Sequence, residues 1–202
     1  MGLVMDRITT EKQAFAAVKN DGLALEYVPE ALRTKKVCLS AVKNHGWALE
    51  YVPKAYRTAK IYLVAVKNDG WVFQKVPDAL KSSKACLAAV KKNGEMLKYV
   101  PKVLMNAELC LAAVKNDGLV LQDVPTMFMT EKLCITAVKN DGLALEYVPE
   151  ALKTMKVCII AAKRAWYMLE YIPIELKTAK MCLSAVKNDG RALEYVSFRS
   201  AT

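Results

Sequence analysis

The chain has 202 residues, of which 54% are hydrophobic, with only 8 glycines and 7 prolines. This composition excludes a disordered tail, a collagen and a low-complexity linker. The longest apolar runs, such as residues 157–162, are far shorter than the roughly 20 residues that a membrane-spanning helix needs. Thirty basic residues against 20 acidic ones give a net charge of +10, which favours acidic partners without identifying one.

A repeat of 24 residues dominates the sequence. The motif A-V-K-N-D-G, first seen at residues 17–22, occurs with small changes in eight copies and no insertion separates them. All 7 prolines fall in one column, and all but one of the 8 glycines fall in another. Such regular spacing of proline and glycine predicts a repeat architecture. We expect one helical-repeat domain over residues 1–202, with a degenerate N-terminal cap at 1–10, eight repeats at 11–196 and a C-terminal tail at 197–202.

Each repeat predicts one α-helix of about ten residues followed by one or two short helical turns. In the second repeat Thr34 can cap the N-terminus of a helix over residues 35–44. We expect Gly46 to end that helix with a positive φ, and Pro53 to open a later short turn. The seventh repeat has lost the Asn, Asp and Gly of this turn, so we expect a bend or an extended helix there.

Stacking of the repeats is required, because one repeat cannot bury its apolar residues alone. The predicted fold is therefore all-α, an α-solenoid or helical repeat superhelix. One column is alanine throughout, as expected where helices approach closely: Ala17, Ala41, Ala65, Ala89, Ala113, Ala137, Ala161 and Ala185. The last repeat leaves an apolar face uncovered, so either the tail or a second subunit covers it. The second alternative is a homodimer through the C-terminal end.

The repeat resembles a family of short tandem helical repeats of unknown function, whose unit reads V-x-x-A-V-K-x-N-G-x-A-L-x-Y. The resemblance runs from about Gln13 to Val196 and implies no catalytic motif. The period is also similar to that of the leucine-rich variant repeats, which alternate α and 3₁₀ helices, although only in length and general pattern. The proline column and the altered turn of the seventh repeat depart from the first pattern.

No feature of the sequence predicts an enzyme, a cofactor or a metal site. The cysteines share one column of the expected core, without the closely spaced pairs of a zinc site: Cys38, Cys86, Cys110, Cys134, Cys158 and Cys182. Free buried thiols suit a reducing compartment, so we expect a cytoplasmic location. The single histidine, His45, stands where five other repeats have aspartate, in a turn expected to be exposed, with no nucleophile or acid arranged around it.

Two lysine columns are the strongest candidates for a functional surface. The late ladder lies near the end of each predicted helix: Lys19, Lys43, Lys67, Lys91, Lys115, Lys139, Lys163 and Lys187. The early ladder lies seven residues before it, on the same helix face: Lys12, Lys36, Lys60, Lys84, Lys132, Lys156 and Lys180. The helix dipole accounts for the late ladder but disfavours the early one. A lysine such as Lys36 therefore caps carbonyls, pairs with an acid such as Glu50, or binds a ligand.

The column after the glycine varies in character, which suggests that it lies at the surface: Leu23, Trp47, Trp71, Glu95, Leu119, Leu143, Tyr167 and Arg191. Trp47 and Trp71 belong to successive repeats, so we expect them to form an aromatic pair. Exposed tryptophan is a frequent binding hot spot, and it is equally often packed at the edge of a core.

These features predict a non-enzymatic interaction module, or scaffold, that presents an elongated basic surface to a protein partner. The expected partner-binding residues are Trp47, Trp71, Glu95, Tyr167, Arg191 and the late ladder. The alternative is sequence-nonspecific binding of nucleic acid, or another polyanion, through the early ladder, with the tryptophans stacking on bases. A third reading is that the chain is a fragment of a longer array or a consensus-like array.

Overall fold

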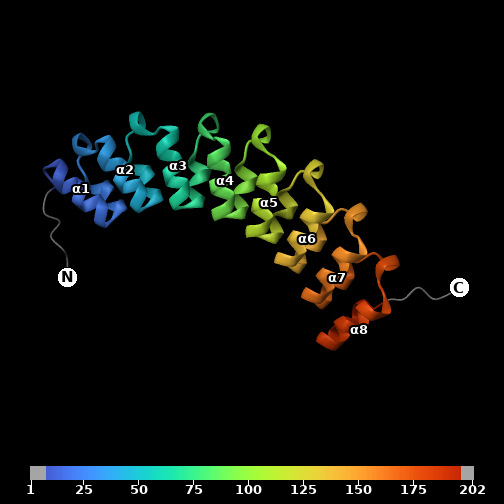
Figure 1. The fold of residues 1–202 in the computed structure, drawn as a ribbon. Helices are drawn as coiled ribbons and strands as arrows, with labels where there is room; N and C mark the ends of the chain where they lie inside the picture. The colour runs from blue at the N-terminus through green and yellow to red at the C-terminus, as the bar shows by residue number, and fades with distance from the viewer. Residues whose placement is uncertain (1–7, 197–202) are drawn as a thin grey trace. The chain divides into compact units, whose positions relative to one another are not determined.

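The computed structural model describes residues 8–196, which contain helices and no strand. The predicted tail at 197–202 and most of the predicted cap at 1–10 lie outside the described residues. The chain divides into two compact units, Met1–Leu104 and Met105–Thr202. Each unit holds four repeats, and within it the α-helices stand side by side in chain order (Figure 1). Each unit is thus an all-α solenoid, which confirms the predicted fold class; a single domain over 1–202 stays a prediction.

The helices recur with constant lengths. In the first unit they are α1 Glu11–Asn20, η1 Gly22–Tyr27, η2 Glu30–Leu32, α2 Lys35–Asn44, η3 Gly46–Tyr51, η4 Lys54–Tyr56, α3 Ala59–Asn68, η5 Gly70–Lys75, η6 Asp78–Leu80, α4 Ser83–Lys92, η7 Gly94–Tyr99 and η8 Lys102–Leu104, where η marks a 3₁₀ helix. In the second unit they are α5 Ala107–Asn116, η9 Gly118–Asp123, η10 Thr126–Phe128, α6 Glu131–Asn140, η11 Gly142–Tyr147, η12 Glu150–Leu152, α7 Met155–Arg164, η13 Trp166–Tyr171, η14 Ile174–Leu176, α8 Ala179–Asn188 and η15 Gly190–Tyr195. One α-helix of 10 residues and short helical pieces per repeat are as predicted.

The α-helices begin where the sequence predicts. The hydroxyl of Thr34 accepts a hydrogen bond from the backbone N–H of Val37 at 3.4 Å, so Thr34 is the N-cap of α2. Thr10 caps α1 in the same way, and the side chain of Gln13 bonds back to the N-cap backbone. A proline lies two residues after the end of every six-residue 3₁₀ helix except η15, as at Pro53, and its fixed φ starts the three-residue helix that comes next.

The glycine column has a different role from the one predicted. No described residue has a positive φ. Helix α2 ends at Asn44, the next residue His45 is extended with φ −139° and ψ 115°, and Gly46 begins η3. The glycines provide space instead, because a Cβ on Gly22 would lie 2.4 Å from the carbonyl oxygen of Ala41 in the next α-helix. The predicted C-cap glycine is therefore wrong, and close approach of neighbouring repeats explains the column.

An asparagine at the end of the α-helix joins at least three of these pairs of repeats. The Oδ1 of Asn44 accepts a hydrogen bond from the backbone N–H of Gly22 at 2.7 Å, and its Nδ2 donates to the carbonyl of Lys19 at 3.0 Å. Asn68 and Asn140 make the same two contacts to the repeat before them. We call this arrangement the asparagine clamp. It satisfies a backbone N–H and a backbone C=O that the helix ends leave unpaired.

The seventh repeat keeps the common backbone despite its changed turn. Helix α7 ends at Arg164, Ala165 is extended with φ −147° and ψ 122°, and η13 follows at once. The guanidinium of Arg164 donates to the carbonyl of Lys139, the acceptor that an asparagine amide uses in other repeats. The expected extended helix is therefore wrong, because an arginine takes over half of the clamp.

The core lies between the α-helices and the six-residue 3₁₀ helices. All six cysteines are buried, and the alanine column is buried except at Ala17, which is half-buried. A third basic column, not recognised from the sequence, forms hydrogen bonds to the ends of the six-residue 3₁₀ helices. Arg33 donates to the carbonyls of Val28 and Tyr51 at 2.8 and 2.9 Å. Lys153 occupies the equivalent place in the second unit and is 8% exposed.

Candidate interaction surface

Every lysine of the two ladders is exposed. The late ladder lies in the last turn of each α-helix, where a cation is stabilised by the helix dipole. The early ladder occupies the second position of the α-helices, in their first turn. The ammonium groups of both ladders can therefore reach solvent along the α-helices of each unit.

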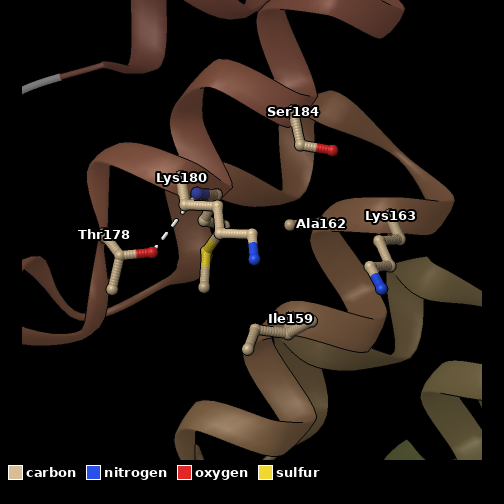
Figure 2. Close-up of a pocket in the computed structure, with 7 residues that line it drawn as sticks. Ile159, Ala162, Lys163, Thr178, Lys180 and Ser184 are labelled. Carbon is tan, nitrogen blue, oxygen red and sulfur yellow. Dashed lines mark hydrogen bonds between the residues drawn. The ribbon is translucent and has the colours of Figure 1, made fainter.

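In the second unit the two ladders meet between neighbouring α-helices. A pocket of about 250 Å³ between α7 and α8 is lined by Lys163 of the late ladder and Lys180 of the early ladder (Figure 2). The pocket of about 380 Å³ between α6 and α7 is likewise lined by Lys139 and Lys156. The sequence alone places the two ladders on one helix face; the structure brings a late lysine and the next repeat's early lysine to one junction.

Apolar side chains form the floor of these pockets. Ile159 lies in the α7–α8 pocket and Ile135 in the α6–α7 pocket. In the first unit, Leu39 and Ile61 line the pocket of about 210 Å³ between α2 and α3, beside Lys60. Each junction therefore combines an apolar floor with flanking ammonium groups.

The acidic residues pair mainly with lysines outside the ladders. Glu50 pairs with Lys75 at 3.3 Å and not with Lys36, which settles one of the alternatives for the early ladder. The ammonium of Lys36 instead lies 4.8 Å from the ring centroid of Phe15, a cation–π distance. Packing on an aromatic ring gives this early lysine a structural role, while its exposure leaves it accessible to a ligand.

The two tryptophans meet through an aspartate and not as a ring pair. Trp47 is half-buried, and its indole Nε1–H donates to Asp69 at 2.7 Å. Trp71 is 42% exposed, and its backbone N–H donates to the same carboxylate at 2.9 Å. Among the described residues, ring contacts join Trp166 to Tyr167 and Tyr195. The expected aromatic pair of Trp47 and Trp71 is therefore wrong, and Trp71 is the more accessible of the two.

The rest of the variable column is mixed. Tyr167 and Arg191 are exposed, whereas Leu23, Leu119 and Leu143 are half-buried. Glu95 is half-buried too and forms an ion pair with Lys98 at 3.6 Å. The guanidinium of Arg191 lies over the ring of Trp166 and lowers the pKa of Asp189 to about 2 through its hydrogen bonds to that carboxylate. A continuous surface stripe is not formed, because five members of the column, Trp47 included, are half-buried.

His45 is half-buried, not exposed as expected. Its Nδ1 is buried and has no hydrogen-bond partner. At the same position Asp69 accepts a hydrogen bond from the N–H two residues on and so caps η5, whereas His45 gives η3 no side-chain cap. His45 is thus a weak replacement for a capping residue.

The cysteine column behaves as core. Burial raises the pKa of Cys38, Cys110, Cys134 and Cys158 to about 11, because the charged thiolate would lose its hydration. Within residues 8–196 no three His, Cys, Asp or Glu side chains gather to hold a metal ion. The helices in the same range are also too short and too polar to cross a membrane.

Comparison with known protein families identifies the family to which the chain belongs. The family described as a domain of unknown function, DUF4116, matches three times in tandem, at residues 12–57, 85–129 and 130–177. These matches cover more than half of the chain, so the chain belongs to this family, in agreement with the resemblance seen in its repeats. The comparison with curated proteins found no match, and neither did the comparison with solved structures.

Proposed function

We propose that the chain is a non-enzymatic interaction module that binds acidic segments of a protein partner on the lysine-bearing edge of each unit. One observation carries this proposal: at a junction such as α6–α7, Lys139 and Lys156 flank an apolar floor formed by Ile135. A peptide with carboxylates on either side of an apolar residue matches that arrangement. Its carboxylates face the ammonium groups, and its apolar side chain covers the floor.

The electrostatics of the surface support an acidic partner. The ion pairs Glu50–Lys75, Asp78–Lys81 and Glu150–Lys153 use lysines outside the two ladders. Among the described residues, ladder lysines such as Lys139 and Lys163 take no part in these ion pairs, so a partner's carboxylates can reach them. Such a surface raises the association rate of an acidic partner, and the effect weakens as salt is added.

Nucleic acid remains the second candidate, because the same exposed lysines can neutralise phosphates. The exposed face of Trp71 offers one surface for base stacking. The protein reading is preferred because the apolar floors between the lysines contribute nothing to binding a phosphate backbone. A base-stacking protein would also place its aromatic residues between the lysines, whereas Trp47 is occupied with Asp69.

Binding of polyglutamate and of single-stranded DNA, each titrated at several salt concentrations, tests the proposal. A Lys43→Gln, Lys60→Gln, Lys67→Gln variant should weaken polyglutamate binding about tenfold at low salt. The matched control neutralises three exposed lysines of the same unit outside the ladders, Lys54, Lys92 and Lys102, and should bind almost as the parent does. Equal losses in both variants contradict the proposal. Steeply salt-dependent DNA binding without polyglutamate binding selects nucleic acid.

The location and assembly of the module are part of the same proposal. We place it in the cytoplasm, since six buried free thiols suit a reducing compartment. Leu183 and Leu193 in the last repeat are 56% and 65% exposed among the described residues, which supports a homodimer through the C-terminal end. Light scattering of the parent and of a Leu183→Glu variant tests this: the parent should be dimeric and the variant monomeric, and a monomeric parent contradicts it.

A further inference from the structure

The pocket between α7 and α8 differs from the other junctions in its floor. Ile159, Ala162 and Met181 supply its apolar surface, and Lys163 and Lys180 flank it from the two helices. In Figure 2, Lys180 extends from α8 towards Ala162, and Lys163 lies on the α7 side of the same space. The pocket has a volume of about 250 Å³ and is partly open to solvent. It is therefore a mainly apolar hollow with two cations beside it.

A single substitution opens this floor. Alanine at position 162 stands where the seven other repeats have valine. In the α2–α3 and α6–α7 pockets the equivalent residues, Val42 and Val138, do not line the space. Ala162 lacks the two γ-methyl groups that fill this place elsewhere. At this junction the pocket therefore extends to the side chain of Ala162.

A second substitution holds the junction apart. Trp166 replaces the glycine that lets neighbouring repeats approach, and at Gly22 even a Cβ would lie 2.4 Å from the next helix. The indole of Trp166 instead packs against Tyr195 of η15, with ring centroids 5.8 Å apart, and beneath Arg191. The seventh repeat therefore brings two changes to the α7–α8 junction: the large side chain of Trp166 and the small side chain of Ala162.

The chemistry of the lining selects an anion with an apolar tail. No acid lines the α7–α8 pocket, whereas Glu131 stands beside the lysines of the α6–α7 pocket. The hydroxyls of Thr178 and Ser184 add polar atoms at the rim. The volume lies below the ~300 Å³ at which pockets for drug-sized ligands begin. At about 30 Å³ per water-sized group it holds a chain of about six to eight carbons.

We propose that the α7–α8 pocket binds a short-chain fatty carboxylate, with the alkyl chain on Ile159, Ala162 and Met181 and the carboxylate between Lys163 and Lys180. This site does not depend on the proposed binding of acidic proteins, because the alkyl chain and not charge alone drives its occupation. Affinity should rise about fourfold per methylene from butyrate to hexanoate, as expected for burial of apolar surface.

Calorimetric titration of the protein with octanoate tests the site. Ala162→Val restores the residue of the other repeats, so the variant should fold, and it should bind octanoate at least tenfold more weakly. Replacing both Lys163 and Lys180 by glutamine should weaken octanoate about tenfold. The same change at Lys139 and Lys156 is the matched control and should have little effect. The methyl resonance of Met181 reports the location, and it should shift on addition of octanoate.

Each outcome bears on the site separately from the proposed function. Polyglutamate should bind the Ala162→Val variant as well as it binds the parent, so loss of octanoate alone identifies the pocket. Equal octanoate binding by the parent and by Ala162→Val overturns the site, as does an unshifted Met181 methyl at saturating octanoate. Absence of polyglutamate binding with intact octanoate binding overturns the proposed function and leaves the pocket standing.

Discussion

Asn68 accepts a hydrogen bond from the backbone N–H of Gly46 at 2.7 Å, and these two residues belong to successive repeats. The same side chain donates to the carbonyl of Lys43 at 3.0 Å. One amide thus satisfies both a donor and an acceptor at the end of the preceding α-helix. The clamp explains why asparagine and glycine occur in fixed columns: one supplies the hydrogen bonds, and the other lets the helix approach.

Removing the clamp should destabilise the protein. Asn68→Ala leaves the N–H of Gly46 and the carbonyl of Lys43 without this partner, so we expect the free energy of unfolding to fall by about 1–3 kcal/mol. Urea denaturation followed by circular dichroism measures this. Asn188→Ala is the matched control, because the residue 22 positions before it is Trp166 and not glycine, and it should cost well under half as much. Equal losses would contradict the clamp.

Replacing a glycine of the column by alanine should lower the stability only where a neighbouring helix lies close. Gly22→Ala places a Cβ 2.4 Å from the carbonyl oxygen of Ala41, so we expect a loss of about 1–3 kcal/mol. At Gly190 nothing lies within 4 Å of the added Cβ, so Gly190→Ala should be neutral or stabilising by up to about 1 kcal/mol. Melting temperatures of the two variants compare the sites directly. A stable Gly22→Ala variant would show that close approach does not explain the column.

His45 offers a stabilising substitution. His45→Asp should provide the side-chain cap that Asp69 gives η5, and it removes a buried nitrogen that has no partner. We expect a gain of about 0.5–2 kcal/mol in the free energy of unfolding. The reverse change, Asp141→His, removes the cap of η11 and should cost a similar amount. The capping argument fails if neither variant moves the urea midpoint.

The buried thiols should make stability depend on alkaline pH. Their pKa rises from an ordinary 9.0 to about 11 in the folded protein, so the unfolded chain releases these protons at lower pH. Proton release then favours unfolding, and stability is full below pH 9 and declines between about 9 and 11. A Cys38→Ala, Cys134→Ala variant should show a shallower decline in its urea midpoint over this window. An unchanged slope contradicts the assignment of the effect to the cysteines.

The period and composition of the repeats are sufficient to predict most of the fold. Prolines in one column and a ten-residue apolar helix per repeat predict the α-helices, their caps and the stacked core with its cysteines and alanines. The role of glycine is not predictable in this way, because a C-cap with positive φ and a close approach by the next repeat both require the same residue. Only coordinates show that Gly22 faces Ala41.

The candidate surface is less predictable from the sequence. Helical periodicity places both ladders on one face of a helix, but it cannot show that Lys163 of one repeat and Lys180 of the next line one pocket. Likewise, the variable column looks like a surface stripe, yet Trp47 turns its indole towards Asp69. Such contacts join residues about one repeat apart, and their geometry depends on how the repeats stack.

Protection of lysines from acetylation, with and without bound polyglutamate, tests the central proposal most directly. Mass spectrometry reports each lysine separately in one sample. We predict that bound polyglutamate protects ladder lysines such as Lys43, Lys139 and Lys156, and that the equally exposed Lys54 and Lys102 react as before. Equal protection of all five, or protection of Lys54 and Lys102 alone, would contradict a binding surface on the α-helix edge.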